Sequence, residues 1–143
     1  MIAIDANLLL YAYSPGSPHH QTAKIWLEGV LSGTEPVGIP LPSIQAFVKL
    51  LTNPVIAGKF IKLEDVFSIV DEWLSLPHVR ILLPGDRHWE LLKRTAIDAH
   101  AIGNLFADAV IASIALEYGA VVHSNDRDFA RFSAVRWKNP LHA

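Results

Sequence analysis

The sequence predicts one α/β domain over residues 1–143, with a mostly parallel central sheet between two layers of helices. Two observations favour this fold class. Short apolar runs recur along the chain, separated by amphipathic stretches long enough to form helices. The first run, Met1 to Ile4, contains no polar residue, as is typical of a strand buried on both faces of a parallel sheet. Strands that alternate with helices predict a doubly wound α/β fold with a mostly parallel sheet.

The predicted strands are the short apolar runs that end at a turn or at a polar residue. Asp5 ends the first run, and Pro40 indicates the end of the second, because proline cannot donate a hydrogen bond to a neighbouring strand. Pro84 and Gly85 form the turn after the third. We expect the five strands at residues 1–4, 37–41, 79–83, 120–123 and 134–137.

Helices are expected between these strands, where apolar residues recur at helical spacing. Ser17-Pro18 is a favourable helix start, and Asp86 is interpreted as the cap of the helix that leads towards Asp98. His19 and His20 are adjacent and cannot face the same way, so we expect them to be solvated residues rather than ligands. The clearest apolar stripes are Ala23, Trp26, Leu27, Val30 and Leu31, and Val66, Val70, Trp73 and Leu74.

Four aspartates fall where parallel strands present their carboxyl ends. Asp5 follows the first strand, and Asp126 and Asp128 follow the fourth. Asp108 lies in the first turns of the helix between Gly103 and Gly119. Ligands gather at this edge of an open parallel sheet, so we expect the four carboxylates to meet. In an extended segment Asp126 and Asp128 point to one side, with Arg127 outward.

Each of these residues also has a purely structural interpretation. Asp5 alone is explained as a helix cap. The segment from Ser124 to Asp128 is also a good loop sequence, stabilised by side-chain bonds to its own backbone. These interpretations account for each aspartate separately, but not for all four lying on one rim.

Carboxylates that close together repel one another unless a cation neutralises them. Oxygen ligands favour Mg²⁺ or Mn²⁺, which can orient and deprotonate a water that attacks a phosphodiester. The chain lacks the G-x-S-x-G, Walker and H-E-x-x-H motifs. With zero Cys, disulfides and a zinc–thiolate site are excluded. Metal-assisted phosphoryl chemistry is therefore the leading enzyme class.

The charge distribution is compatible with a phosphate-bearing substrate but does not require one. The net charge is only −2, so the chain has no overall basic signature for nucleic acid. Basic residues crowd the last strands, where they could contact phosphates or simply form a solvated face. They are Arg127, Arg131, Arg136 and Lys138.

The ordered motifs resemble a known family over essentially the whole chain. They read Asp-Ala-Asn-Leu-Leu-Leu from Asp5, Gly-Asn-Leu-Phe-Ala-Asp-Ala around Asp108, Val-His-Ser-Asn-Asp-Arg-Asp-Phe around Asp126, and Arg-Trp-Lys-Asn-Pro-Leu at the end. The set resembles the PIN-domain family, and within it the VapC-type toxins of bacterial toxin–antitoxin pairs. The resemblance implies a PIN-like α/β/α sandwich and a homodimer. It also implies a Mg²⁺- or Mn²⁺-dependent endoribonuclease that cleaves structured RNA and is held inactive by a VapB-type antitoxin.

The resemblance also assigns site residues. Asp5, Asp108 and Asp126 match the metal-binding acids, Asp128 matches a further catalytic acid, and Asn7 and Ser124 match polar supporting positions. We expect Arg127 and Arg131 to contact substrate.

One departure concerns a glutamate that the family usually carries in the helix after the second strand. Ala46 is the nearest match to that position here, beside Gln45. A neutral oxygen from Gln45 could support the site, or water could fill the gap. The loss leaves a second hypothesis open, namely a catalytically weak or inactive protein that binds RNA or metal. A phospho-acceptor domain is a poorer match, because Asp5-Ala-Asn lacks the adjacent acids that such domains carry after the first strand.

Composition bears on partners and location. Hydrophobic residues make up 51% of the chain, and helices carrying Trp26 and Trp73 suggest a groove for an amphipathic antitoxin helix, although these stripes also suit a core. The apolar run from Ala107 to Leu116 is shorter than the roughly 20 residues a membrane span needs. No Lys or Arg lies near Met1, so we expect no secretory leader and a cytoplasmic protein.

Overall fold

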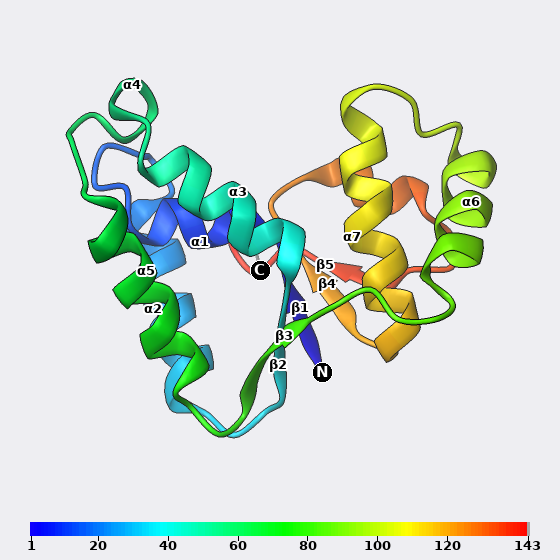
Figure 1. The fold of residues 1–143 in the computed structure, drawn as a ribbon, viewed down its shortest axis with the longest axis horizontal. Coiled ribbons are helices and arrows are strands. Elements are labelled where there is room, and N and C mark those ends of the chain that lie inside the picture. Colours follow the sequence, from blue (N-terminus) through cyan, green and yellow to red (C-terminus); the bar gives the residue numbers. More distant parts are fainter. Residues whose placement is uncertain (143) are drawn as a thin grey trace.

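A five-stranded parallel sheet forms the centre of the molecule (Figure 1). The computed structural model describes residues 1–142. All neighbouring strands are parallel, in the order β3-β2-β1-β4-β5. The strands are β1 (Ile2–Ile4), β2 (Val37–Pro40), β3 (Val79–Leu82), β4 (Val121–His123) and β5 (Trp137–Lys138).

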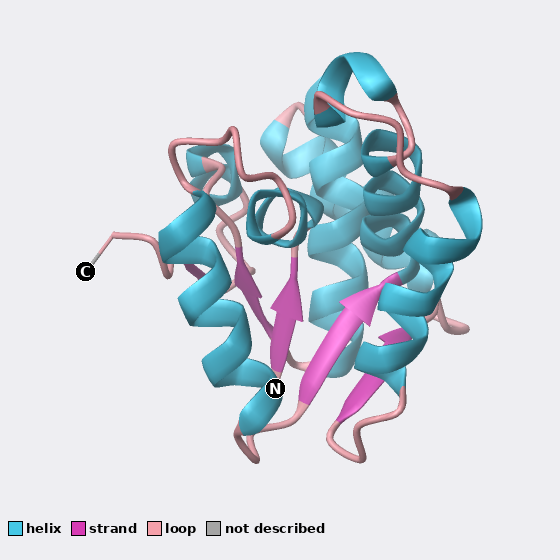
Figure 2. Ribbon diagram, turned by 90° about the vertical axis from the view of Figure 1, so that its left-hand side faces the viewer, coloured by secondary structure: helices cyan, strands magenta, loops and turns pink. Residues whose placement is uncertain are grey.

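Helices cover both faces of this sheet, which confirms the predicted α/β/α sandwich (Figures 1 and 2). One layer contains α1 (Ala6–Ala12), α2 (His20–Ser32), α3 (Leu41–Leu51) and α5 (Leu63–Leu74), with the short α4 (Pro54–Ala57) between α3 and α5. The other layer contains α6 (His88–Ala99) and α7 (Asn104–Tyr118). A 3-10 helix, η1 (Arg127–Arg131), joins β4 to β5. Among residues 1–142, no helix has both the length and the apolar character that a membrane crossing requires.

The core has two parts, one on each face of the sheet. Successive strand residues point to opposite faces, so Ile2 and Ile4 pack with the α1, α2, α3 and α5 layer, whereas Ala3 packs with α6 and α7. Trp73 is only 2% exposed, and its Nε1 donates to Tyr13 Oη at 3.1 Å. Trp73 therefore belongs to the core, which was the alternative interpretation of its stripe, and does not line a groove for a partner.

Helix α7 lies close to the sheet because its inner face is built from small residues. Ala109, Ala112 and Ala115 are fully buried. The helix ends at Gly119, which adopts the left-handed conformation (φ +65°) that favours glycine. This close packing fixes Asp108, on the same helix, against the edge of the sheet.

Long-range contacts move several boundaries away from their predicted positions. Helix α6 begins at His88 rather than at Asp86, and its entry is capped from α7. The Glu117 carboxylate accepts hydrogen bonds from the backbone N–H groups of Gly85 (2.9 Å) and Arg87 (3.1 Å). Asp86 is therefore not the cap, because a residue about 30 positions away supplies the acceptors.

The first loop and the last strand also differ from expectation. Helix α2 begins at His20, two residues after Pro18. His20 is not simply solvated, because its Nδ1 lies 2.9 Å from the Tyr11 carbonyl oxygen and anchors the loop. The final strand pairs through Trp137 and Lys138, slightly later than predicted.

Candidate functional site

The site lies where the strand order of the sheet reverses. β1 is flanked by β2 on one side and β4 on the other, and parallel α/β sheets bind ligands beyond the carboxyl ends of the strands at such a point. Ile4 pairs with His123, so the two strands end level with each other. The Asp5 N–H then donates to the His123 carbonyl at 3.0 Å. This register brings the residues after β1 against those after β4.

Three carboxylates meet at this edge. Oxygen atoms of Asp108, Asp126 and Asp128 all lie within 4.8 Å of one another. Asp108 comes from the second turn of α7, and the other two come from the segment after β4. Asp108 and Asp126 are half-buried and Asp128 is exposed, so the group opens to solvent on one side. We call these three residues the acidic group.

The local structure that joins Asp126 to Asp128 differs from the expected extended segment. Asp126 caps the 3-10 helix η1, and its Oδ1 accepts a hydrogen bond from the Asp128 N–H at 2.9 Å. Phe129, which is fully buried, anchors η1 to the core. The curvature of the backbone, rather than strand alternation, brings the two carboxylates together. The segment is therefore a loop stabilised by its own side chains and also part of the site.

Asp5 lies beside the acidic group but outside its tightest cluster. Its side chain is buried, and each of its oxygens already has a partner. Oδ1 accepts from the Ala6 N–H at 2.8 Å, and Oδ2 accepts from the Ser124 hydroxyl at 2.6 Å. Asp5 is therefore both a helix cap and a buried acid, and the Ser124 side chain links it to Asp126.

Ser124 is the centre of the hydrogen-bond network behind the acids. Its fully buried hydroxyl donates to Asp5 and accepts from Asn7 Nδ2 (3.1 Å) and from the Asp126 N–H (2.9 Å). Asn7 Oδ1 in turn accepts from the Asn125 N–H at 3.4 Å. The network ties the end of β1 to the end of β4 and fixes the position of Asp126.

The electrostatics of the site favour a bound cation. Burial, together with the negative charges of Asp126, Asp5 and Asp128, raises the pKa of Asp108 to about 7. Burial also raises the pKa of Asp5, although the hydrogen bonds from Ser124 and Ala6 oppose the shift. A cation bound between the carboxylates would neutralise the negative charges that contribute to the raised pKa of Asp108. Mg²⁺ and Mn²⁺ prefer carboxylate and water oxygens as ligands, so the residues present fit such an ion.

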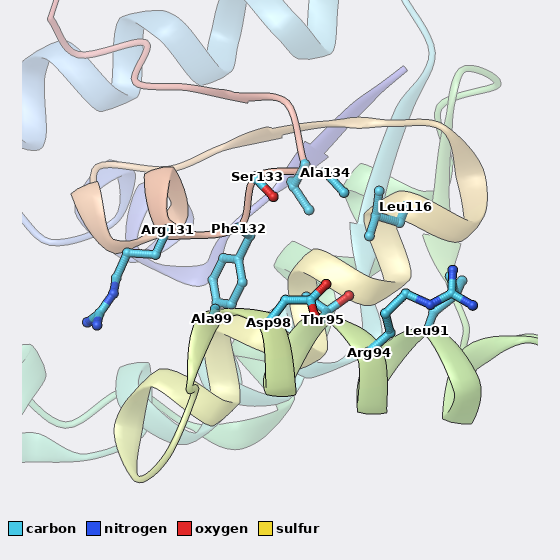
Figure 3. A pocket seen from close by; sticks show the side chains of 11 residues that line it. Leu91, Arg94, Thr95, Asp98, Ala99, Leu116, Arg131, Phe132, Ser133 and Ala134 are labelled. Atoms are coloured by element: carbon cyan, nitrogen blue, oxygen red, sulfur yellow. The ribbon is translucent and has the colours of Figure 1, made fainter.

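The two arginines predicted to meet substrate line different hollows. Arg127 is exposed and borders a hollow of about 570 Å³ beside the acidic group. Arg131 lies at the edge of a separate cavity of about 180 Å³ between α6 and the segment after η1 (Figure 3). Arg136, in contrast, donates to the Gly119 carbonyl at 2.9 Å, at the opposite end of the sheet. Arg136 therefore does not border the acids.

Helix α3, where the family glutamate is missing, contributes nothing to the acidic group. Gln45 is exposed and Ala46 is half-buried. Within residues 1–142, the three clustered acids all come from α7 and from the segment after β4. The site therefore gathers its carboxylates without α3.

Sequence reasoning missed the residues that support the segment after β4 from the carboxyl terminus. Trp137 Nε1 donates to the Ser124 carbonyl at 3.0 Å, and Asn139 Nδ2 donates to Asn125 Oδ1 at 2.9 Å. The only signal was that Trp137 and Asn139 occur in the closing motif. Nothing local indicated that they bond to the acidic loop.

Comparison with known proteins agrees with this geometry. The PIN domain family model matches residues 2–135. Ribonuclease VapC33 of Mycobacterium tuberculosis is 34% identical over 141 residues, covering 99% of both chains. Ribonuclease VapC37 of the same organism is 37% identical over 140 residues, covering 98% of this chain and 97% of that one.

Solved structures share the fold at lower identity. The VapBC-1 structure from nontypeable Haemophilus influenzae matches with a TM-score of 0.71 and 20% identity, covering 98% of both chains. VapC20 of Mycobacterium tuberculosis, described as a toxin that cleaves the sarcin-ricin loop, matches with a TM-score of 0.68 and 18% identity, covering 95% of this chain and 99% of that one. Taken together, the sheet order, the acids at its switch point and the match over nearly the whole chain show that this protein belongs to the PIN-domain family.

Proposed function

We propose that the protein is a metal-dependent endoribonuclease and the toxin of a VapBC-type toxin–antitoxin pair. The observation that carries the proposal is the acidic group, three carboxylates within 4.8 Å of one another at the switch point of the sheet. The relatives named as VapC ribonucleases support RNA as the substrate. Because RNA is the substrate and the chain has zero Cys, we place the activity in the cytoplasm.

The residues have distinct proposed roles. Asp108, Asp126 and Asp128 would hold Mg²⁺ or Mn²⁺, and Asp5 lies beside them as a fourth acid. Ser124 and Asn7 keep Asp5 and Asp126 in place through their hydrogen bonds. An ion held there would supply activation of a water for attack on phosphorus and neutralisation of charge on the leaving oxygen. Arg127 and Arg131, both exposed, are proposed to contact substrate phosphates.

Cleavage of total RNA by the purified protein tests this function. We expect products with Mg²⁺ or Mn²⁺ and none with EDTA. Asp108→Asn should abolish cleavage, because it removes a ligand and a charge together. Asp71→Asn is the matched control, since Asp71 is exposed on α5, on the other face of the sheet. Cleavage that persists in EDTA, or equal activity of Asp108→Asn and wild type, would contradict the proposal.

A second candidate follows from the missing glutamate. Because α3 supplies none of the clustered acids, the site has lower charge than its family pattern, and the protein is alternatively a catalytically weak or inactive RNA- or metal-binding protein. This alternative predicts that RNA is retained without product in the same assay.

We also propose a VapB-type antitoxin and a second copy of this chain as partners. Solved neighbours are described as VapBC complexes, which supports the antitoxin. Large apolar side chains are exposed from α4 to α5, and we call them the 55–67 patch: Val55 (91% exposed), Ile56 (48%), Phe60 (76%), Leu63 (46%) and Phe67 (50%). Exposed apolar surface of this kind is typical of protein interfaces.

A further inference from the structure

A hollow beside the acidic group has a lining unlike the rest of the site. It encloses about 570 Å³ and is formed by Asn125, Arg127, Trp137, Asn139 and His142. None of these residues is acidic, although the acids of the site are close by. We call this hollow the Arg127–Trp137 groove.

The aromatic member of the lining is held in a fixed position. Trp137 is half-buried in β5, and its Nε1 donates to the Ser124 carbonyl at 3.0 Å. The indole ring is therefore already oriented along the groove and needs no change of rotamer to contact a ligand there. Aromatic rings held in this way stack with nucleobases of any sequence.

The polar members supply the other contacts that a nucleotide needs. Arg127 is exposed at the mouth and offers a cation to a phosphate. Asn139 and Asn125 are joined by an amide hydrogen bond of 2.9 Å, which holds both amides at the wall of the groove. Amide groups can hydrogen-bond the edge of an unpaired base.

The groove shares a backbone segment with the acidic group. Asn125 and Arg127, two of its lining residues, are the immediate neighbours of Asp126, whose carboxylate belongs to the acidic group. Adjacent Cα atoms are about 3.8 Å apart, so the backbone segment that carries two of the groove residues also carries Asp126. The groove therefore adjoins the acidic group along the chain.

We propose that the Arg127–Trp137 groove binds one unstacked nucleotide of a single-stranded RNA segment next to the phosphodiester that is cut. The base stacks on Trp137, its phosphate meets Arg127, and its edge contacts Asn139. The choice of RNA rests on the proposed function. The cavity in Figure 3 is a poorer candidate, because it is smaller, at about 180 Å³, and its lining includes the Asp98 carboxylate.

Binding can be measured without cleavage in an Asp108→Asn background. The probe is a short fluorescein-labelled single-stranded oligoribonucleotide, followed by fluorescence anisotropy over a range of salt concentrations. Trp137→Leu should weaken binding about tenfold, because it removes a base stack. Arg127→Ala should lower the slope of log Kd against log salt by about one, because it removes one phosphate contact. A duplex of the same sequence should bind more weakly than the single strand, because its bases are already stacked.

Two matched controls lie on α6, away from the groove. Trp89→Leu makes the same change at an exposed tryptophan, and Arg94→Ala removes an exposed arginine. Both should bind like the parent. Trp137→Phe keeps a ring but loses the Nε1 donor, so it should retain most of the affinity. Thermal unfolding of every variant shows which ones are folded, and if Trp137→Leu is not, the salt slope of Arg127→Ala decides.

The outcomes separate this inference from the proposed function. Unchanged affinity in Trp137→Leu and an unchanged salt slope in Arg127→Ala would overturn the groove, even if the wild type cleaves RNA with Mg²⁺ or Mn²⁺. Failure of the parent to bind the probe, or equal losses in Trp137→Phe and Trp137→Leu, would overturn it as well. If instead the groove variants weaken binding while the wild type never cleaves, the groove stands and the nuclease proposal fails.

Discussion

At the residue scale, Asp108 is where stability and function oppose each other. Burial and the neighbouring acids raise its pKa from 3.8 to about 7. Between these values the folded protein holds a proton that the unfolded chain has released. Without metal, the free energy of unfolding therefore declines as the pH rises from about 4 to about 7. Above the folded-state pKa, the stability that protonation of Asp108 provides at low pH is fully lost.

The decline in stability with rising pH should depend on Asp108, so we expect it to weaken in Asp108→Asn, which keeps the size of the side chain but removes its titration. In EDTA, wild type should lose thermal stability between about pH 4 and pH 7, and Asp108→Asn should lose clearly less. Mg²⁺ should raise the melting temperature of wild type more at the higher pH, where Asp108 is ionised, and should not do so for the variant. Differential scanning fluorimetry with Asp71→Asn as control measures both effects. Parallel pH profiles for wild type and Asp108→Asn would contradict the pKa argument.

Ser124 carries a second residue-scale prediction. Its hydroxyl is the partner of the Asp5 carboxylate, the Asn7 amide and the Asp126 N–H. Ser124→Ala leaves these groups unpaired around a fully buried position, so we expect a loss of about 1–3 kcal/mol in the free energy of unfolding.

Urea unfolding measures the loss, with Ser133→Ala as the control at an exposed serine. Equal stability of the two variants would show that water replaces the hydroxyl. Cleavage by Ser124→Ala should fall as well, because Asp126 loses the bond that positions its backbone.

At the element scale, the turn between α6 and α7 determines where α7 begins and so where Asp108 lies. Helix α6 ends at Ala99, and the next residue, His100, has the left-handed conformation (φ 50°) that L-residues with side chains rarely adopt. Gly103, with φ 61°, follows before α7. Of the two residues with positive φ in this turn, His100 carries a conformational cost because it has a β-carbon, whereas Gly103 does not.

Replacing His100 with glycine should relieve that cost. His100→Gly is expected to raise the free energy of unfolding by about 1 kcal/mol, because a β-carbon is disfavoured in this conformation. Lys93→Gly, in the middle of the same helix, should lower it by a similar amount. Chemical denaturation of the two variants provides the comparison. Destabilisation by both glycines would show that the His100 side chain makes a compensating contact.

At the scale of the whole molecule, the exposed apolar side chains support the proposal that the chain assembles with a partner. The 55–67 patch extends over α4 and the start of α5, next to a hollow of about 300 Å³ that Leu10, Ile56 and Ala57 help to line. Basic side chains, Lys59 and Lys62, lie within the same segment. A second copy of this chain would cover the apolar side chains, whereas an acidic, amphipathic antitoxin segment would cover the apolar and the basic ones. The oligomeric state of the isolated chain decides between these two occupants.

The prediction for this surface is a change in assembly. Size-exclusion chromatography with light scattering should give the mass of a dimer for wild type, and a monomer for the double variant Phe60→Asp and Phe67→Asp. Ile97→Asp, at a 70% exposed position on α6, is the control and should behave like wild type. A monomeric wild type, or the same mass for all three proteins, would remove this patch from the dimer interface.

The sequence by itself determined the fold class and the positions of the acids. Apolar runs and helical stripes are local patterns, so they predict strands and helices without knowledge of the contacts between them. Asp5, Asp108 and Asp126 could be placed together because all parallel strands present their carboxyl ends at one edge. The ordered motifs were enough to indicate the family.

Only the tertiary structure decided how those acids are held and what surrounds them. Ser124 bonds to Asp5 across 119 positions of sequence, and Glu117 caps the entry to α6 from another helix. Arg136 turns to the far end of the sheet, and Trp73 enters the core. Such pairings depend on which elements become neighbours after folding, and residue type or spacing along the chain does not encode them locally.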